Sequence, residues 1–122
     1  MCNMLISINP EHVENIFNGS KKYEYRKVKC KRKIDKIIIY STYPIKKVVG
    51  EASVEEILED SPEVIWNETK EESGIDISFY EQYFKNSNKA VAYKLKDIKR
   101  YSKPRSLLNY GIKFAPQSYV YV

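Results

Sequence analysis

The chain has 122 residues, which is enough for one hydrophobic core and too few for two, so we expect a single domain over residues 1–122. Hydrophobic residues make up 43% and charged residues 30%, a balance that excludes an intrinsically disordered chain. No apolar run approaches the roughly 20 residues of a membrane-spanning helix, and the first residues lack the layout of a signal peptide. We therefore expect a cytoplasmic protein with no membrane partner.

The first half of the chain reads as four strands and one helix. Residues 4–8 favour a strand, after which Asn9-Pro10 supplies an N-cap and a first-turn proline for a helix that Gly19 ends. Three further β-forming runs follow. They are residues 22–27, 34–42 and 47–58, with Gly50 as a candidate bulge in the last run.

The second half begins with two helices and returns to strands. Ser61-Pro62 and Asp76 are helix-start signals, and an aromatic stripe on the second helix predicts packing against the sheet. The stripe consists of Phe79, Tyr80, Tyr83 and Phe84. Residues 90–98 and 117–122 read as strands. Because strands outnumber helices and do not alternate regularly with them, we predict an α+β domain built on a curled mixed sheet or small barrel.

The charges are unevenly distributed along the chain. Residues 21–36 and 85–113 each carry nine Lys or Arg, whereas residues 51–72 carry nine acids and one lysine. Two basic segments can combine into one positive face that attracts phosphate backbones. The alternative is that these lysines only keep a small protein soluble.

The stretch GSKKYEYR, residues 19–26, concentrates ionisable groups just after a turn glycine. Strand alternation predicts that Lys22, Glu24 and Arg26 share one face. Lys21 lies at the turn itself, so its direction is not fixed by this alternation. If Lys21 bends inward, it joins Glu24 and Arg26.

This stretch fits the G-x-K-x-x-E-x-R motif of ASCH domains, a branch of the PUA-like superfamily. The chain also resembles ASCH proteins in its other segments, in order: LISINP, the helix to Gly19, YSTYP, VGE, a Trp-containing acidic helix ending at EESGI, YFK and PQSY. The resemblance implies a PUA-like small mixed or antiparallel β-barrel with flanking helices. It also implies a cleft lined by Lys21, Glu24 and Arg26, and RNA or a nucleotide as the partner, with a role in RNA metabolism or transcription regulation.

For a binding module, each residue type has a clear use. Lys21 and Arg26 would hold phosphate or the acceptor edge of a base, and Glu24 would accept from an exocyclic amine. Further candidates are two tyrosines that could stack on an unpaired base and three neutral side chains that could form hydrogen bonds. They are Tyr40, Tyr43, Ser41, Thr42 and Gln117.

Hydrolysis is the alternative, in two forms. Some ASCH proteins are thought to be ribonucleases, and in such an enzyme Lys21, Glu24 and Arg26 would serve as phosphate clamp and general base. A related PUA-like family removes the acetyl group of acetylated cytidine with a Lys, a Thr and a Glu. Lys21 and Glu72 match the first and third of these, but Glu24 stands where that family has the threonine.

No metal or cofactor is expected from the sequence. Cys2 and Cys30 form no CxxC pair, and His12 is the single histidine, so a four-ligand zinc site cannot be assembled. His12 also has no Cys or Ser partner nearby for a catalytic triad. We expect Lys21 and Arg26 to be exposed charges whose removal leaves the melting temperature nearly unchanged.

Overall fold

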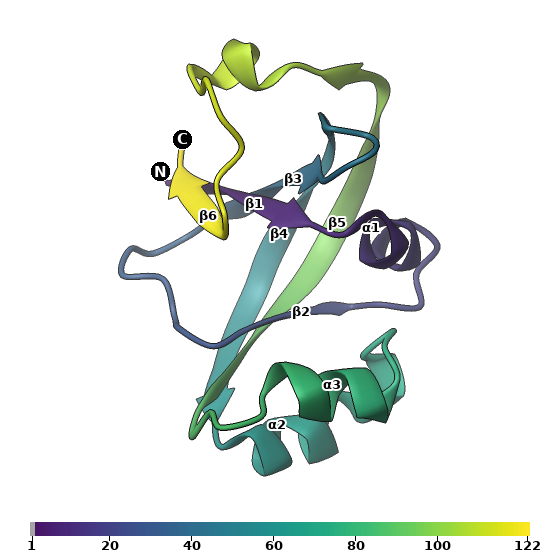
Figure 1. The fold of residues 1–122 in the computed structure, drawn as a ribbon, viewed down its shortest axis with the longest axis vertical. Coiled ribbons are helices and arrows are strands. Elements are labelled where there is room, and N and C mark those ends of the chain that lie inside the picture. Colours follow the sequence, from purple (N-terminus) through teal and green to yellow (C-terminus); the bar gives the residue numbers. More distant parts are fainter. Residues whose placement is uncertain (1) are drawn as a thin grey trace.

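A computed structural model of the chain describes residues 2–122 as a curled sheet with two helices at one end and a third beside it (Figure 1). In chain order its elements are β1 (Asn3–Ile8), α1 (Pro10–Phe17), β2 (Tyr23–Arg26), β3 (Lys36–Ser41), β4 (Lys47–Asp60), α2 (Pro62–Thr69), the 3-10 helix η1 (Lys70–Glu72), α3 (Ile77–Tyr83), β5 (Ala90–Arg105), the 3-10 helix η2 (Leu107–Tyr110) and β6 (Tyr119–Tyr121). The predicted α+β class is therefore confirmed.

The six strands form one mixed sheet in the order β2-β5-β4-β3-β1-β6. β1 runs parallel to β3, and the other neighbours are antiparallel. The edge strands approach one another through side chains, because Arg26 at the end of β2 donates to the carbonyl of Ser7 in β1 and to the hydroxyl of Ser118 before β6. The sheet is thus a half-barrel whose open side is bridged by hydrogen bonds from Arg26.

All three helix-start signals function as predicted. The side chains of Asn9, Ser61 and Asp76 accept hydrogen bonds from backbone N–H groups of the first turns of α1, α2 and α3. Gly19 follows α1 with φ of 89°, a conformation that favours glycine. The local rules therefore place the helices correctly.

β5 differs from the prediction, because it continues to Arg105 instead of ending near residue 98. Residues 101–104, including Pro104, face the single residue Val49 of β4, between the pairs Gly50–Arg100 and Val48–Arg105. Proline is tolerated there because an irregular stretch does not require its missing N–H. The bulge beside Gly50 in β4, predicted from the glycine, is present.

The acidic segment lies between the two basic ones. β4 runs between β3 and β5, and its glutamates pair with lysines of both neighbours and of the turn before β5. The pairs are Glu51–Lys36, Glu55–Lys94 and Glu59–Lys89, at 2.8, 3.0 and 3.5 Å. The unpaired positive surface is therefore smaller than the sequence indicates.

Candidate functional site

A cavity of about 130 Å³, called the pocket below, lies between the end of β1, α1, β2 and α3. Its polar lining comes from six residues: Ser7, Asn9, His12, Lys21, Glu24 and Arg26. Its apolar wall is mostly aromatic: Ile8, Tyr25, Ile75, Phe79, Tyr80, Tyr83 and Phe84. The pocket thus joins a charged wall from the GSKKYEYR stretch to an aromatic wall from α3.

Lys21 is directed into the pocket by its backbone. Its N–H donates to the carbonyl of Asn15 at 2.9 Å, and Gly74 packs directly against it. A methyl group at Gly74 would lie 2.6 Å from the Cα of Lys21, so only glycine permits this approach. As a result Lys21 is 2% exposed, which contradicts the expectation that it is a surface charge.

The amine of Lys21 has three neighbours inside the protein. Nζ donates to the carbonyl of Ser73 at 3.3 Å, lies 3.8 Å from Oε1 of Glu24, and stands 4.7 Å from the centre of the Tyr25 ring. Burial lowers the pKa of Lys21, the charge of Glu24 opposes this, and the charge of Arg26 adds to it. A lysine with a lowered pKa in a cavity is typical of functional sites.

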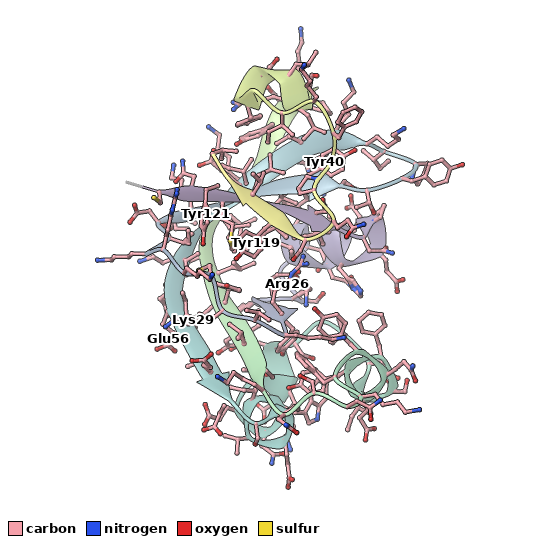
Figure 2. The ribbon with its side chains drawn as sticks, turned by 60° about the vertical axis from the view of Figure 1, so that its left-hand side comes forward. Arg26, Lys29, Tyr40, Glu56, Tyr119 and Tyr121 are labelled. Atoms are coloured by element: carbon pink, nitrogen blue, oxygen red, sulfur yellow. The ribbon has the colours of Figure 1, made fainter. Side chains whose placement is uncertain are left out.

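Glu24 and Arg26 share the strand β2 and form a tight pair. Nη2 of Arg26 donates to Oε2 of Glu24 at 2.9 Å, and the two side chains are 15% and 8% exposed. The same Nη2 also donates to the carbonyl of Ser7 at 2.9 Å, and Nη1 reaches Oγ of Ser118 at 3.3 Å. Figure 2 shows Arg26 next to β6, in the gap that it bridges.

The predicted face of β2 needs one correction. Lys22 points away from the pocket, is half-exposed, and pairs with Glu72 at 2.9 Å. Lys21 takes the inward position in its place, because the regular alternation of β2 begins only at Tyr23. Two cations and one carboxylate, Lys21, Arg26 and Glu24, therefore meet in the pocket.

His12 was not selected from the sequence as a site residue, yet it lines the pocket. Its ring meets the Phe79 ring edge-on at 4.8 Å, and its Nδ1 is buried with no hydrogen-bond partner among residues 2–122. Burial lowers the pKa of His12, and the charge of Lys21 lowers it further. Only the docking of α1 against α3 and β2 reveals this histidine, so no sequence signal marks it.

The aromatic stripe of α3 is partly core and partly pocket. Tyr80 and Phe84 are buried against Tyr25, as the prediction of helix packing requires. Phe79 is 48% exposed and Tyr83 half-buried, and both line the pocket. The outer half of the stripe is therefore available to a ligand.

The remaining candidates lie away from the pocket. Tyr40 and Ser41 are buried at the end of β3, where Tyr40 packs with Leu5 and Val48. Thr42 and Tyr43 follow in the β3–β4 turn, and Tyr43 is 81% exposed. Gln117 is exposed beside Ser118, the partner of Arg26. Glu72 is held outside the pocket by Lys22.

Residues 2–122 contain neither a candidate metal site nor a helix suited to crossing a membrane. No group of three or more His, Cys, Asp or Glu side chains is placed to hold a metal ion in this part of the chain. Within the same range, no helix has the length and apolar character needed to cross a membrane.

Comparisons with known proteins agree with the geometry. The ASCH domain model matches residues 6–99. The crystal structure of ASCH from Zymomonas mobilis superimposes with a TM-score of 0.89, at 28% identity, covering 98% of this chain and 87% of that one. The N-terminal domain of Staphylothermus marinus McrB shares the fold at a TM-score of 0.54 and 16% identity, covering 88% of this chain and 77% of that one.

Curated relatives extend beyond the matched region. An ASCH domain-containing ribonuclease of Zymomonas mobilis is 32% identical over 94 residues, which is 76% of this chain and 64% of the relative. The ATP synthase subunit alpha and the ribosomal protein uL22 of Ureaplasma parvum are 29% and 28% identical over 98% of this chain, which spans 15% and 39% of their lengths. The chain belongs to the ASCH domain family.

Proposed function

We propose that this ASCH domain binds single-stranded RNA and holds one nucleotide of it in the pocket. The observation that carries the proposal is the charge of the pocket, where the buried Lys21 and the partly buried Arg26 share the single carboxylate of Glu24. An RNA phosphate would supply the missing negative charge, and its oxygens are good acceptors for both cations.

The aromatic wall supports RNA rather than a free anion. Phe79 and Tyr83 present ring surface at the pocket, and unpaired bases stack on such rings. A double-stranded partner would keep its bases stacked on each other and out of reach. The combination of excess cation and available aromatic rings is therefore suited to a nucleotide of a single strand.

The test uses two neighbouring lysines, of which Lys21 is directed into the pocket and Lys22 away from it. Lys21→Met removes the buried amine, and Lys22→Met removes the adjacent exposed one. We expect Lys21→Met to weaken binding of a labelled single-stranded RNA about tenfold or more, and Lys22→Met to change it about twofold at most, in fluorescence anisotropy. Equal losses in both variants would show that the pocket is not the binding site.

RNA cleavage in the same pocket is a second candidate, favoured by His12 and by the relative named a ribonuclease. Neutral His12 would accept the proton of a ribose 2′-hydroxyl, whose oxygen attacks the neighbouring phosphorus. The 5′-oxygen of the next nucleotide then leaves, taking a proton from the Lys21 ammonium, while Arg26 stabilises the phosphorane. The products would be a 2′,3′-cyclic phosphate and a 5′-hydroxyl end.

Mass spectrometry of RNA incubated with the protein tests this second candidate. Fragments ending in a cyclic phosphate, present with the wild type and absent with His12→Asn and Lys21→Met, would support cleavage. Binding without any fragments would rule cleavage out and leave the pocket a recognition site.

A further inference from the structure

A second hollow, of about 570 Å³, lies beside the C-terminal part of β5. Four cations line it, and we call it the basic groove after them: Lys47, Lys99, Lys103 and Arg105. Its other polar lining is neutral, from Ser102, Ser106 and Asn109, and no carboxylate borders it. Figure 1 shows this end of β5, with η2 and the β3–β4 turn, at the end of the molecule opposite α2 and α3.

The basic groove keeps its charge because the nearby acid, Glu51, is bound to partners outside the four groove cations. Glu51, opposite Lys99 in the sheet, binds Lys36 at 2.8 Å and accepts from the Tyr101 hydroxyl at 2.8 Å. Within residues 2–122, none of the four groove cations lies within ion-pair distance of a carboxylate. By contrast, Lys94 in the first half of β5 and Lys89 in the turn before it pair with Glu55 and Glu59 of β4.

Arg105 is held in a defined position within the groove. Its guanidinium stacks on the Tyr101 ring at 3.8 Å from the ring centre and donates to the Tyr110 hydroxyl at 3.1 Å. These contacts fix the plane of the guanidinium and leave other N–H donors free, which is the arrangement that suits phosphate recognition. The lysines beside it are exposed and able to follow a flexible chain.

We infer that the basic groove is a second binding site for the backbone phosphates of single-stranded RNA, separate from the pocket. Cationic and neutral donors without acids are typical of phosphate contacts, which position a nucleic acid without reading its sequence. The turn that leads to Lys47 also presents Tyr43, 81% exposed, as a surface on which an unpaired base can stack. The inference rests on the proposed function, since it assigns a further part of the same ligand.

The test compares two triple variants with the same change in net charge. The groove variant is Lys47→Gln, Lys99→Gln, Lys103→Gln, which keeps Arg105 and its packing. The control is Lys70→Gln, Lys85→Gln, Lys96→Gln, three exposed lysines without ion-pair partners in the described chain and outside the groove. Binding of an oligouridine of about 20 nucleotides, long enough for more than one contact, is measured against salt concentration.

We expect the groove variant to flatten the slope of log affinity against log salt by about 2, since each single-strand phosphate contact contributes about 0.7. The control should keep the wild-type slope. Equal slopes for the two triple variants would overturn the inference.

A dinucleotide probe and Lys21→Met separate this inference from the proposed function. If Lys21→Met weakens dinucleotide binding and the groove variant binds both the dinucleotide and the oligouridine as the wild type does, the pocket is supported as a binding site and the groove is refuted. If the groove variant weakens binding of the oligouridine and Lys21→Met changes the binding of neither RNA, the groove is supported and the pocket is refuted. If the wild type binds neither RNA, both are refuted.

Discussion

Replacing Glu24 by glutamine should destabilise the domain strongly. Within residues 2–122, Glu24 is the only carboxylate in contact with the buried Lys21 and the partly buried Arg26. Removing one partner of a buried ion pair costs about 3–5 kcal/mol, because the other charge is left uncompensated. With an unfolding entropy of about 2.1 cal/mol/K per residue, the 122 residues give about 0.26 kcal/mol/K, so the melting temperature should fall by roughly 12–20 °C.

The loss of stability in Glu24→Gln should depend on pH in a defined direction. Burial lowers the pKa of Lys21 below its ordinary 10.5, so between the two values the unfolded chain binds more protons and stability rises with pH. The Glu24 charge opposes this lowering. Glu24→Gln should therefore lower the folded-state pKa of Lys21 further and extend toward neutral pH the range in which stability rises with pH. The difference in the free energy of unfolding between Glu24→Gln and wild type should therefore be largest below the folded-state pKa that Lys21 has in the variant. It should shrink as the pH rises from there to the folded-state pKa of Lys21 in the wild type.

Chemical denaturation of two single variants and the double variant tests this reasoning. Lys21→Met alone leaves Glu24 paired with Arg26, so its cost should be small. Adding Lys21→Met to Glu24→Gln should restore part of the lost stability, because it removes one of the two uncompensated charges. A double variant whose loss equals the sum of the single losses would show that Lys21 and Glu24 are not coupled, and would refute the argument.

Three further substitutions probe the boundary of the pocket. Gly74→Ala should cost about 1–3 kcal/mol and weaken RNA binding, since its methyl group would press on Lys21 at a residue with φ of 66°; an unchanged melting curve would contradict this packing. Burial lowers the pKa of His12, so the stability of the wild type should fall as the pH drops below 6.5. His12→Asn should remove that dependence when chemical denaturation is measured between about pH 5 and 7. Parallel plots of stability against pH for the wild type and the variant would argue against it. Glu72→Gln should leave RNA affinity unchanged, because Glu72 pairs with Lys22 outside the pocket. A loss of affinity as large as that of Lys21→Met, measured by fluorescence anisotropy, would place Glu72 in the site.

Sequence reasoning works best here where structure is decided locally. Asn9, Ser61 and Asp76 act as helix caps because a cap depends only on the next few residues. The predicted end of β5 at residue 98 was wrong, because the prediction followed only the alternation of apolar and polar residues, whereas the register with β4 continues through an irregular stretch to Arg105.

The candidate site was predictable in composition and not in burial. The G-x-K-x-x-E-x-R pattern brings Lys21, Glu24 and Arg26 together, and the structure places all three in the pocket. The burial of Lys21 depends on Ser73 and Gly74, more than 50 positions away in the chain. Long-range packing of this kind leaves no local pattern.

Stability alone does not account for the charges of the pocket. A buried ion pair often contributes less than apolar side chains of the same volume, and Lys21 keeps its position at a cost that its lowered pKa reflects. The same low-dielectric surroundings strengthen any attraction between the excess positive charge and an incoming phosphate. A nucleotide that binds only the folded state should therefore raise the melting temperature of the wild type, and should raise it less in Lys21→Met, where the excess charge is gone.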